Sequence, residues 1–293
     1  MARSQSTRPS KAPRRPGLFG VRTWTKTRLL IAVVFAAISM LPLFYMVSLS
    51  FQPTGLIGVD GATFVPTHPL VANYVSAWTK NSFGHFFFNS LLVSIATVAL
   101  TVVFASLAAF AFARYKFPLK EVIFYLFLAS LAVPSVELII PQFLLMLRLH
   151  LVDSLAGLVL IYTTTNLPFS IFLLRGFFEG VPREYEESFR LDGAGTLRVL
   201  TRLIVPLSLP AVAVVAMFTF NFAWDEFVIA LTLIHTTSHR TLPIGLALFI
   251  QSEGRTEWGP FMAASVIATV PLVIVYLLSQ RWFRSGVSLG GIR

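Results

Sequence analysis

Six long apolar segments constrain most strongly how this chain can fold. They lie at residues 29–50, 86–113, 121–147, 156–174, 207–234 and 261–278, and each is about as long as the roughly 17–25 residues with which a helix crosses a bilayer, or somewhat longer. Charged residues make up only 12% of the chain, against about 25% in soluble proteins. Because hydrocarbon cannot satisfy free backbone N–H and C=O groups, such segments form helices. We therefore expect an all-α polytopic membrane bundle with six transmembrane helices.

The basic residues predict how this bundle is oriented. If the N-terminus is cytoplasmic, all but four of the 23 Lys and Arg fall in cytoplasmic segments; the exceptions are Lys80, Arg148, Arg240 and Arg255. The positive-inside rule therefore places both termini in the cytoplasm and makes residues 51–85 an extracytoplasmic loop. The same distribution explains the net charge of +10 by topology and by attraction to anionic lipid, so no nucleic-acid partner is predicted.

The ends of the chain differ in composition from the membrane domain at residues 29–284. Residues 1–28 are rich in Pro and Ser and carry eight basic residues and no acid, which is typical of a disordered cytoplasmic tail. A secretory signal peptide is disfavoured because the apolar run that follows is too long and further spans come after it. Residues 285–293 are expected to form a short cytoplasmic tail.

A charged segment at residues 182–206 interrupts the apolar pattern within the cytoplasmic loop 175–206. Pro182 suits the start of a helix, and the glutamates after it suit a first helical turn. Gly193 and Gly195 can supply the backbone that ends a helix. We expect two short amphipathic helices around a glycine break that contact a soluble partner; a merely solvated loop is the alternative.

The chain carries no recognisable catalytic or phosphate-binding chemistry. It has no cysteine and no G-x-x-x-x-G-K-[ST] loop, so any ATPase would be a separate polypeptide. His235 and His239 are four residues apart but lack the carboxylate pattern of a metal site. We expect no cofactor, no metal and no catalytic residue.

Acids within the apolar segments are the remaining candidates for function, because charge is costly in hydrocarbon. Asp225 and Glu226 follow Asn221 and Trp224 in the fifth segment, and Glu137 lies in the third. They could line a polar translocation path in which Trp224 stacks on a sugar ring. They could instead form structural or interfacial pairs, or serve an ion-coupled secondary transporter.

The charged segment resembles the signature cytoplasmic loop of binding-protein-dependent ABC importer permeases. That family pattern is E-A-A, three residues, G, nine residues, then I-x-L-P; here the segment reads E-S-F-R-L-D-G-A and ends in V-P. Ser188 and Phe189 replace the two alanines, and Leu203 and Val205 replace the Ile and the Leu. The resemblance implies that the ATPase-coupling residues are Glu186, Glu187, Ser188, Asp192, Gly193, Ala194 and Pro206. Among them, Glu187 would anchor the docking and Gly193 would set the turn.

Further segments are similar to the maltose-type sugar importer permeases, including F-F-N-S-L at 87–91, L-P-F-S-I-F-L-L-R-G-F-F at 167–178 and W-D-E-F at 224–227. The resemblance implies a permease subunit in the inner membrane of a bacterium that works by alternating access. Its partners would be a second homologous permease, two ABC ATPase subunits and an extracytoplasmic sugar-binding protein. Permeases for glycerol phosphate, amino acids or polyamines remain alternatives. The family usually shows Asn where this chain has Asp225.

Overall fold

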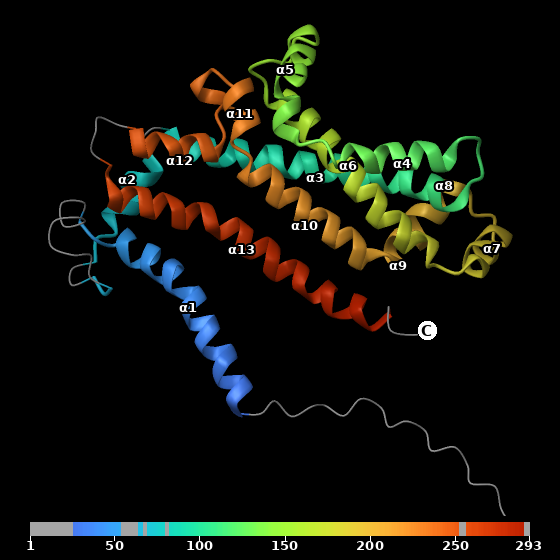
Figure 1. Cartoon of the computed structure of the whole chain (residues 1–293), viewed down its shortest axis with the longest axis horizontal. Helices are drawn as coiled ribbons and strands as arrows, with labels where there is room; N and C mark the ends of the chain where they lie inside the picture. The colour runs from blue at the N-terminus through green and yellow to red at the C-terminus, as the bar shows by residue number, and fades with distance from the viewer. Residues whose placement is uncertain (1–25, 54–63, 67–68, 80–81, 252–255, 290–293) are drawn as a thin grey trace, which may run out of the picture. The chain divides into compact units, whose positions relative to one another are not determined.

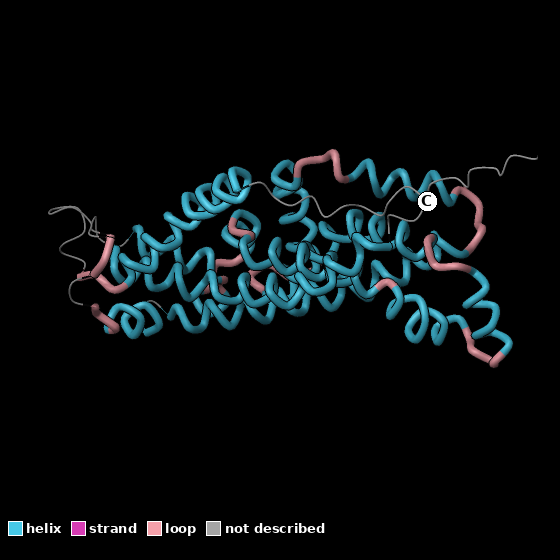
Figure 2. The backbone as a smooth tube through the Cα atoms, turned by 90° about the horizontal axis from the view of Figure 1, so that it is seen from below, coloured by secondary structure: helices cyan, strands magenta, loops and turns pink. Residues whose placement is uncertain are grey.

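The computed structural model describes residues 26–53, 64–66, 69–79, 82–251 and 256–289, in which every regular element is a helix (Figures 1 and 2). The expected tail at 1–28 lies outside these residues up to residue 25, as do parts of the loop 51–85 and the last four residues. The chain divides into one unit at residues 1–45 and a second at 46–293. Helix α1, Lys26–Ser50, begins in the first unit and is long and apolar enough from Arg28 onward to cross a membrane.

The second unit is built on four long helices: α3 (Phe83–Arg114), α6 (Leu155–Glu179), α10 (Leu209–Asp225) and α13 (Trp258–Leu289). Helix α3 packs most extensively on α6 and next on α10, and α13 packs on α10 (Figure 1). The shorter elements are α2 (Ala72–Thr79), α4 (Lys120–Ser130), η3 (Ser135–Leu138), α5 (Ile139–Arg148), α7 (Arg183–Leu191), α8 (Thr196–Val199), η4 (Leu200–Ile204), α9 (Val205–Leu207), α11 (Val228–Leu233), η5 (Thr237–His239) and α12 (Leu242–Gln251).

Two of the expected spans are not continuous helices. The segment 121–147 is divided into α4 and η3–α5, which meet at an angle of 96°; Pro134 at the break lacks a backbone N–H and disfavours helical geometry in the residue before it. The segment 207–234 is divided where α10 ends at Asp225 and α11 begins at Val228. In the described residues four single helices could cross a membrane, or up to six if each sharply bent helix pair is one span.

Small side chains on α3 allow its neighbours to approach closely. Ser90, Ser94, Thr97, Thr101 and Ala105 follow one face of the helix and are each at most 1% exposed. Without a hydrophobic driving force between helices in lipid, van der Waals contact at such small-residue faces holds helices together. The face therefore explains why α6 and α10 both pack on α3.

Two of the sequence segments noted above meet in space. The Phe87 ring lies edge-on to the Trp224 ring, with 5.5 Å between centroids. The side-chain amide of Asn89 donates to the backbone carbonyls of Ser238 and Arg240 at 2.8 and 2.9 Å. F-F-N-S-L thus joins the start of α3 to the end of α10 and to the loop after α11.

We predict opposite effects for two glycines of α6. A Cβ at Gly157 would lie 2.3 Å from the backbone oxygen of Leu151, whereas a Cβ at Gly176 would meet nothing within 4 Å. Gly157→Ala should therefore destabilise the protein by about 1–3 kcal/mol, because a backbone atom must move. Gly176→Ala should be neutral or stabilise by up to about 1 kcal/mol. Thermal unfolding of the purified protein in detergent measures both, and equal midpoints would contradict the close approach.

Candidate functional site

The turn between the two helices of the charged segment 182–206 is a Schellman motif. Helix α7 ends at Leu191, and Gly193 adopts a left-handed backbone with φ of 78°. The N–H of Gly193 donates to the carbonyl of Arg190, and the N–H of Ala194 donates to that of Phe189, both at 3.0 Å. This motif commonly brings an apolar contact between the residues at the positions of Ala194 and Phe189. The sequence D-G-A therefore ends α7 as expected, and the bulky Phe189 is the apolar partner of that turn.

A buried ion pair fixes α7 to the end of α3. The guanidinium Nε–H of Arg114 donates to Glu186 Oε1, and another N–H of the same group donates to the carbonyl of Val181 at 2.8 Å. The two side chains are only 7% and 8% exposed. Neither charge could stay in this environment without the other. Arg114 was not among the residues singled out from sequence, since nothing local to it reveals a partner 72 positions away.

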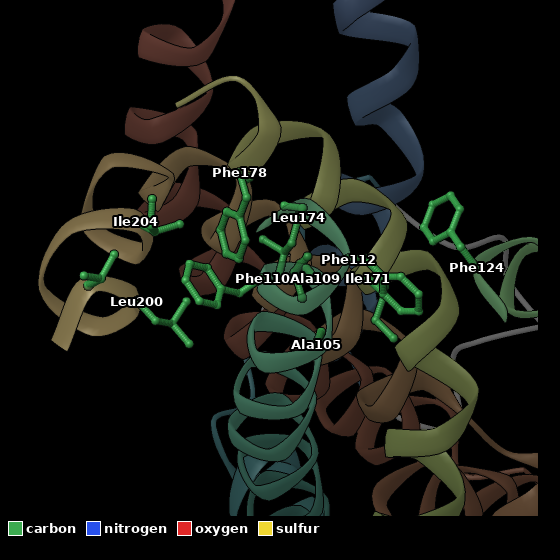
Figure 3. Close-up of a cluster of buried hydrophobic side chains, with 14 of the residues drawn as sticks. Ala105, Ala109, Phe110, Phe112, Phe124, Ile171, Leu174, Phe178, Leu200 and Ile204 are labelled. Atoms are coloured by element: carbon green, nitrogen blue, oxygen red, sulfur yellow. The ribbon is translucent and has the colours of Figure 1, made fainter. Parts of the chain in front are cut away.

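An apolar cluster joins the second helix of the segment to the long helices. Val199, Leu200 and Ile204 are at most 4% exposed. They belong to one cluster with side chains of α3, α4 and α6, and Figure 3 shows Leu200 and Ile204 facing the group of Phe110, Leu174 and Phe178. Fully burying each side chain of this kind contributes about 1.5–3 kcal/mol. The segment is therefore part of the folded unit and not a solvated linker.

The outer face of the segment is left exposed. Glu187, Ser188, Asp192 and Gly193 are exposed, and Leu191 is 89% exposed. Beside them an open hollow of about 560 Å³ is lined by Gly193, Gly195, Thr196, Leu197, Arg198, Thr201 and Arg202. The face thus combines acidic side chains on α7, the exposed Leu191 and basic side chains on α8 and η4. Such a combination can bind a protein surface with complementary charges.

Two of the expected coupling residues lie inside the fold. Glu186, one of the expected coupling residues, has its carboxylate buried against Arg114. Ala194 is likewise buried, at 8% exposure, in the apolar cluster. Pro206 is exposed. The side chains of Glu186 and Ala194 therefore hold the segment in place.

Trp224 and Glu226 have structural contacts that the sequence did not reveal. Trp224 is 2% exposed, stacks on Phe220 with 5.5 Å between centroids, and donates its indole N–H to the carbonyl of Ala268. The expectation that it stacks on a sugar ring is wrong for this conformation, because its ring has no open face. Glu226 accepts from the Tyr162 hydroxyl at 2.6 Å and from the N–H groups of Ile229 and Ala230 at 2.7 and 3.0 Å. It caps the start of α11.

Asn221, Asp225 and Glu137 remain as exposed polar side chains. Asn221 and Asp225 are four residues apart and share a face of α10. Glu137 lies on a separate element, η3, in the break between α4 and α5. Asn221 and Asp225 thus lie on one exposed face of α10. Glu226, by contrast, is held by hydrogen bonds from Tyr162 and the start of α11.

A second anchor links the loops before α6 and after α11. Asp153 accepts from the backbone N–H groups of His235 and Thr236, both at 2.9 Å, and from the Thr236 hydroxyl. The hydrogen bond from that hydroxyl, together with those from the backbone and the nearby His239, lowers the pKa of Asp153 to about 2 against the opposing effect of burial. His239 contacts the carbonyl of Asp153 through Nδ1 at 2.7 Å. Among the described residues no group of three or more His, Asp or Glu could hold a metal ion.

Comparison with known proteins identifies the class to which this arrangement belongs. Residues 101–289 match the family described as binding-protein-dependent transport system inner membrane component. The chain belongs to this family of membrane transport subunits and is not an enzyme.

Individual relatives agree with this class. The chain is 32% identical over 278 residues to a sulfoquinovosyl glycerol transport system permease of Agrobacterium fabrum, covering 95% of this chain and 97% of the relative. It is 34% identical over 268 residues to a trehalose/maltose transport system permease of Thermococcus litoralis, covering 89% and 94%. A crystal structure of a bacterial ABC transporter that imports the polysaccharide alginate matches the fold with a TM-score of 0.79 at 21% identity, over 92% of this chain and 100% of that one.

We predict that the Arg114–Glu186 pair is the main polar support of α7. Glu186→Ala should destabilise the protein by about 3–5 kcal/mol, because it leaves the Arg114 charge buried and unpaired. Glu187→Ala, at an exposed neighbouring position, should change stability by no more than about 0.5 kcal/mol. Thermal unfolding in detergent measures both variants. The double variant with Arg114→Met and Glu186→Leu has no buried charge at this place. If it were as unstable as Glu186→Ala alone, an unpaired charge would not be the cause of the lost stability.

The lowered pKa of Asp153 predicts a pH dependence of the anchor between the two loops. A carboxyl whose pKa is lower in the folded state stabilises the fold above its unfolded pKa, near 4, and loses this contribution as the pH falls toward 2. Asp153→Asn should therefore lower stability by about 1–2 kcal/mol at pH 7. The difference from the wild type should shrink between pH 4 and pH 2. A difference that is constant over this range would show that the charge of Asp153 contributes nothing.

Proposed function

We propose that the chain is the transmembrane permease subunit of an ATP-driven ABC importer for a sugar or oligosaccharide, in the inner membrane of a bacterium. The observation that carries this proposal is the anchored charged segment 182–206: one face is built into the ends of α3 and α6, while the other is exposed and charged. A sugar substrate is supported by relatives named for sulfoquinovosyl glycerol and trehalose/maltose transport.

In this proposal the two ABC ATPase subunits are separate chains, and one of them docks on the exposed face of the segment. Glu187, Ser188 and Asp192 contact it, with Glu187 as the main anchor. A second homologous permease completes the translocation path, and an extracytoplasmic binding protein delivers the sugar. Both termini are cytoplasmic. The bent pair of α4 with η3–α5 crosses the membrane as one span, and α10 with α11 forms another, while residues 175–206 stay on the cytoplasmic side.

The anchoring suggests how movement is transmitted. Because the Arg114–Glu186 pair and the apolar cluster join α7 and η4 to α3 and α6, a displacement of the segment moves the long helices with it. A rigid element with two arrangements can carry a coupling free energy between distant sites. Closure of the ATPase dimer thereby switches the path between inward and outward opening. The sharp bend of 83° between Thr196–Leu207 and α10 allows the segment to pivot.

We test the proposal with Glu187→Lys in the complex reconstituted in proteoliposomes with its permease partner, ATPases and binding protein. Sugar uptake and the stimulation of ATP hydrolysis by loaded binding protein should both fall at least about tenfold, since a reversed charge at an exposed docking position opposes association. The thermal stability of the subunit should change little, because Glu187 is exposed and, among the residues that the structure describes, has no hydrogen bond or ion pair.

Glu187→Asp is the matched control, because it keeps the charge at the same position and should retain most of the coupling. A panel of neutral disaccharides, including trehalose and maltose, identifies the sugar that is taken up. Undiminished uptake by Glu187→Lys would rule out the segment as the coupling site. An absence of uptake for every saccharide by the wild type would rule out a sugar importer.

A further inference from the structure

One face of α10 carries an aromatic ring, an amide and a carboxylate in a line. Phe218, Asn221 and Asp225 follow at helical spacing, and all three are exposed, Phe218 to 51%. The opposite face, with Phe220, Ala223 and Trp224, is buried against α3 and α13. The exposed line therefore forms a distinct stripe with two polar side chains, Asn221 and Asp225, on a helix whose other residues are almost all apolar.

Asp225 does not serve the stability of its helix. It is the last residue of α10, where a negative charge meets the negative end of the helix dipole. Within the described residues it has no hydrogen bond or ion pair, whereas the carboxylate of Glu226 beside it accepts three hydrogen bonds. A carboxylate that is unpaired and unfavourably placed for the helix points to a role outside the fold.

Helix α6 extends the stripe with one aromatic side chain. The Phe169 ring, which is partly exposed, lies 5.5 Å from that of Phe218. We call Phe169, Phe218, Asn221 and Asp225 the α6–α10 surface. Because a carboxylate facing lipid tails is strongly disfavoured, this surface must face water or another chain. Aromatic rings beside amide and carboxylate groups suit a molecule with apolar ring faces and many hydroxyl groups.

We infer that the α6–α10 surface contacts the passing saccharide and that the charge of Asp225 makes the path favour neutral or amino-bearing saccharides over acidic ones. This inference rests on the proposed function. Helix α10 contains no basic residue. The single basic residue of α6, Arg175, is engaged by Glu121 and Glu179 and lies over the Phe124 ring. No cation on either helix is thus free to receive an anionic sugar.

The relatives do not decide this question. One is named for transport of sulfoquinovosyl glycerol, which carries a sulfonate, and another for trehalose and maltose, which are neutral. The negative charge on the α6–α10 surface is a property of this chain, and it repels an anionic saccharide but not a neutral one.

The test compares three forms of the neutral saccharide that the reconstituted complex takes up: the sugar itself, its derivative with one hydroxymethyl group oxidised to a carboxylate, and its derivative with one hydroxyl replaced by an amine. Each uptake rate is expressed as a ratio to that of the neutral form. Because the binding protein is the same throughout, its own preference cancels when a variant is compared with the wild type.

Asp225→Asn should raise the acidic-to-neutral ratio about fivefold and lower the amino-to-neutral ratio by a similar factor, as expected for one nearby charge in a medium of intermediate dielectric constant. Asn221→Asp should shift both ratios in the opposite directions. The double variant, which moves the charge by one helical turn, should return them toward the wild-type values. Glu184→Gln removes an exposed carboxylate of α7, away from the α6–α10 surface, and should leave both ratios unchanged.

Equal slowing of all three forms by Asp225→Asn would overturn the inference and indicate that the surface packs against another subunit. Ratios that change equally in Glu184→Gln would overturn it as well, since the effect would then not be local. Either result would leave the sugar importer in place. If the wild type took up no saccharide, the proposed function and this inference would both fail.

Discussion

The apolar cluster shared by the charged segment and the ends of α3 and α6 is the contact on which the rest of the structure depends. Without it, residues 182–206 would be a hydrophilic loop with no fixed geometry. Val199, Leu200 and Ile204 bury their side chains there, and the buried Arg114–Glu186 pair adds a directional contact. Burial supplies most of the free energy, while the ion pair fixes the orientation of α7, because its geometry is specific and neither charge tolerates the loss of the other. The exposed charges are consequently presented on a rigid support.

The two neighbouring acids at the end of α10 show how backbone direction separates two roles. Asp225 is the last residue of a helix, where its charge is unfavourable, and Glu226 precedes the next helix, where its charge is favourable. The carboxylate of Glu226 therefore stabilises the fold, while the carboxylate of Asp225 is left available for other contacts. This division also explains why the chain breaks between α10 and α11: Glu226 satisfies the N–H groups that the start of α11 exposes.

The features that depend on neighbouring residues could be predicted from the sequence. The helical class follows from apolar segments in lipid, and the end of α7 follows from D-G-A, whose glycine adopts the left-handed conformation that the turn requires. Contacts between side chains far apart in the chain could not be predicted in this way. Arg114 with Glu186, Tyr162 with Glu226 and Trp224 with Ala268 are joined over 72, 64 and 44 positions, and no pattern around any of these residues records its partner. Glu186, expected among the coupling residues, and Trp224, expected along a translocation path, are buried at contacts that the sequence does not reveal.

The sequence by itself determined the family, the helical class and the presence of a charged segment between apolar helices, because hydropathy and turn chemistry act within a few residues along the chain. Only the tertiary structure decided which face of that segment is buried, where the third and fifth apolar segments break, and which of two adjacent acids remains free. These properties depend on which surfaces are brought together when α3, α6, α10 and α13 pack. Packing is set by the shapes and charges of side chains on different helices, and those become neighbours only in the folded protein.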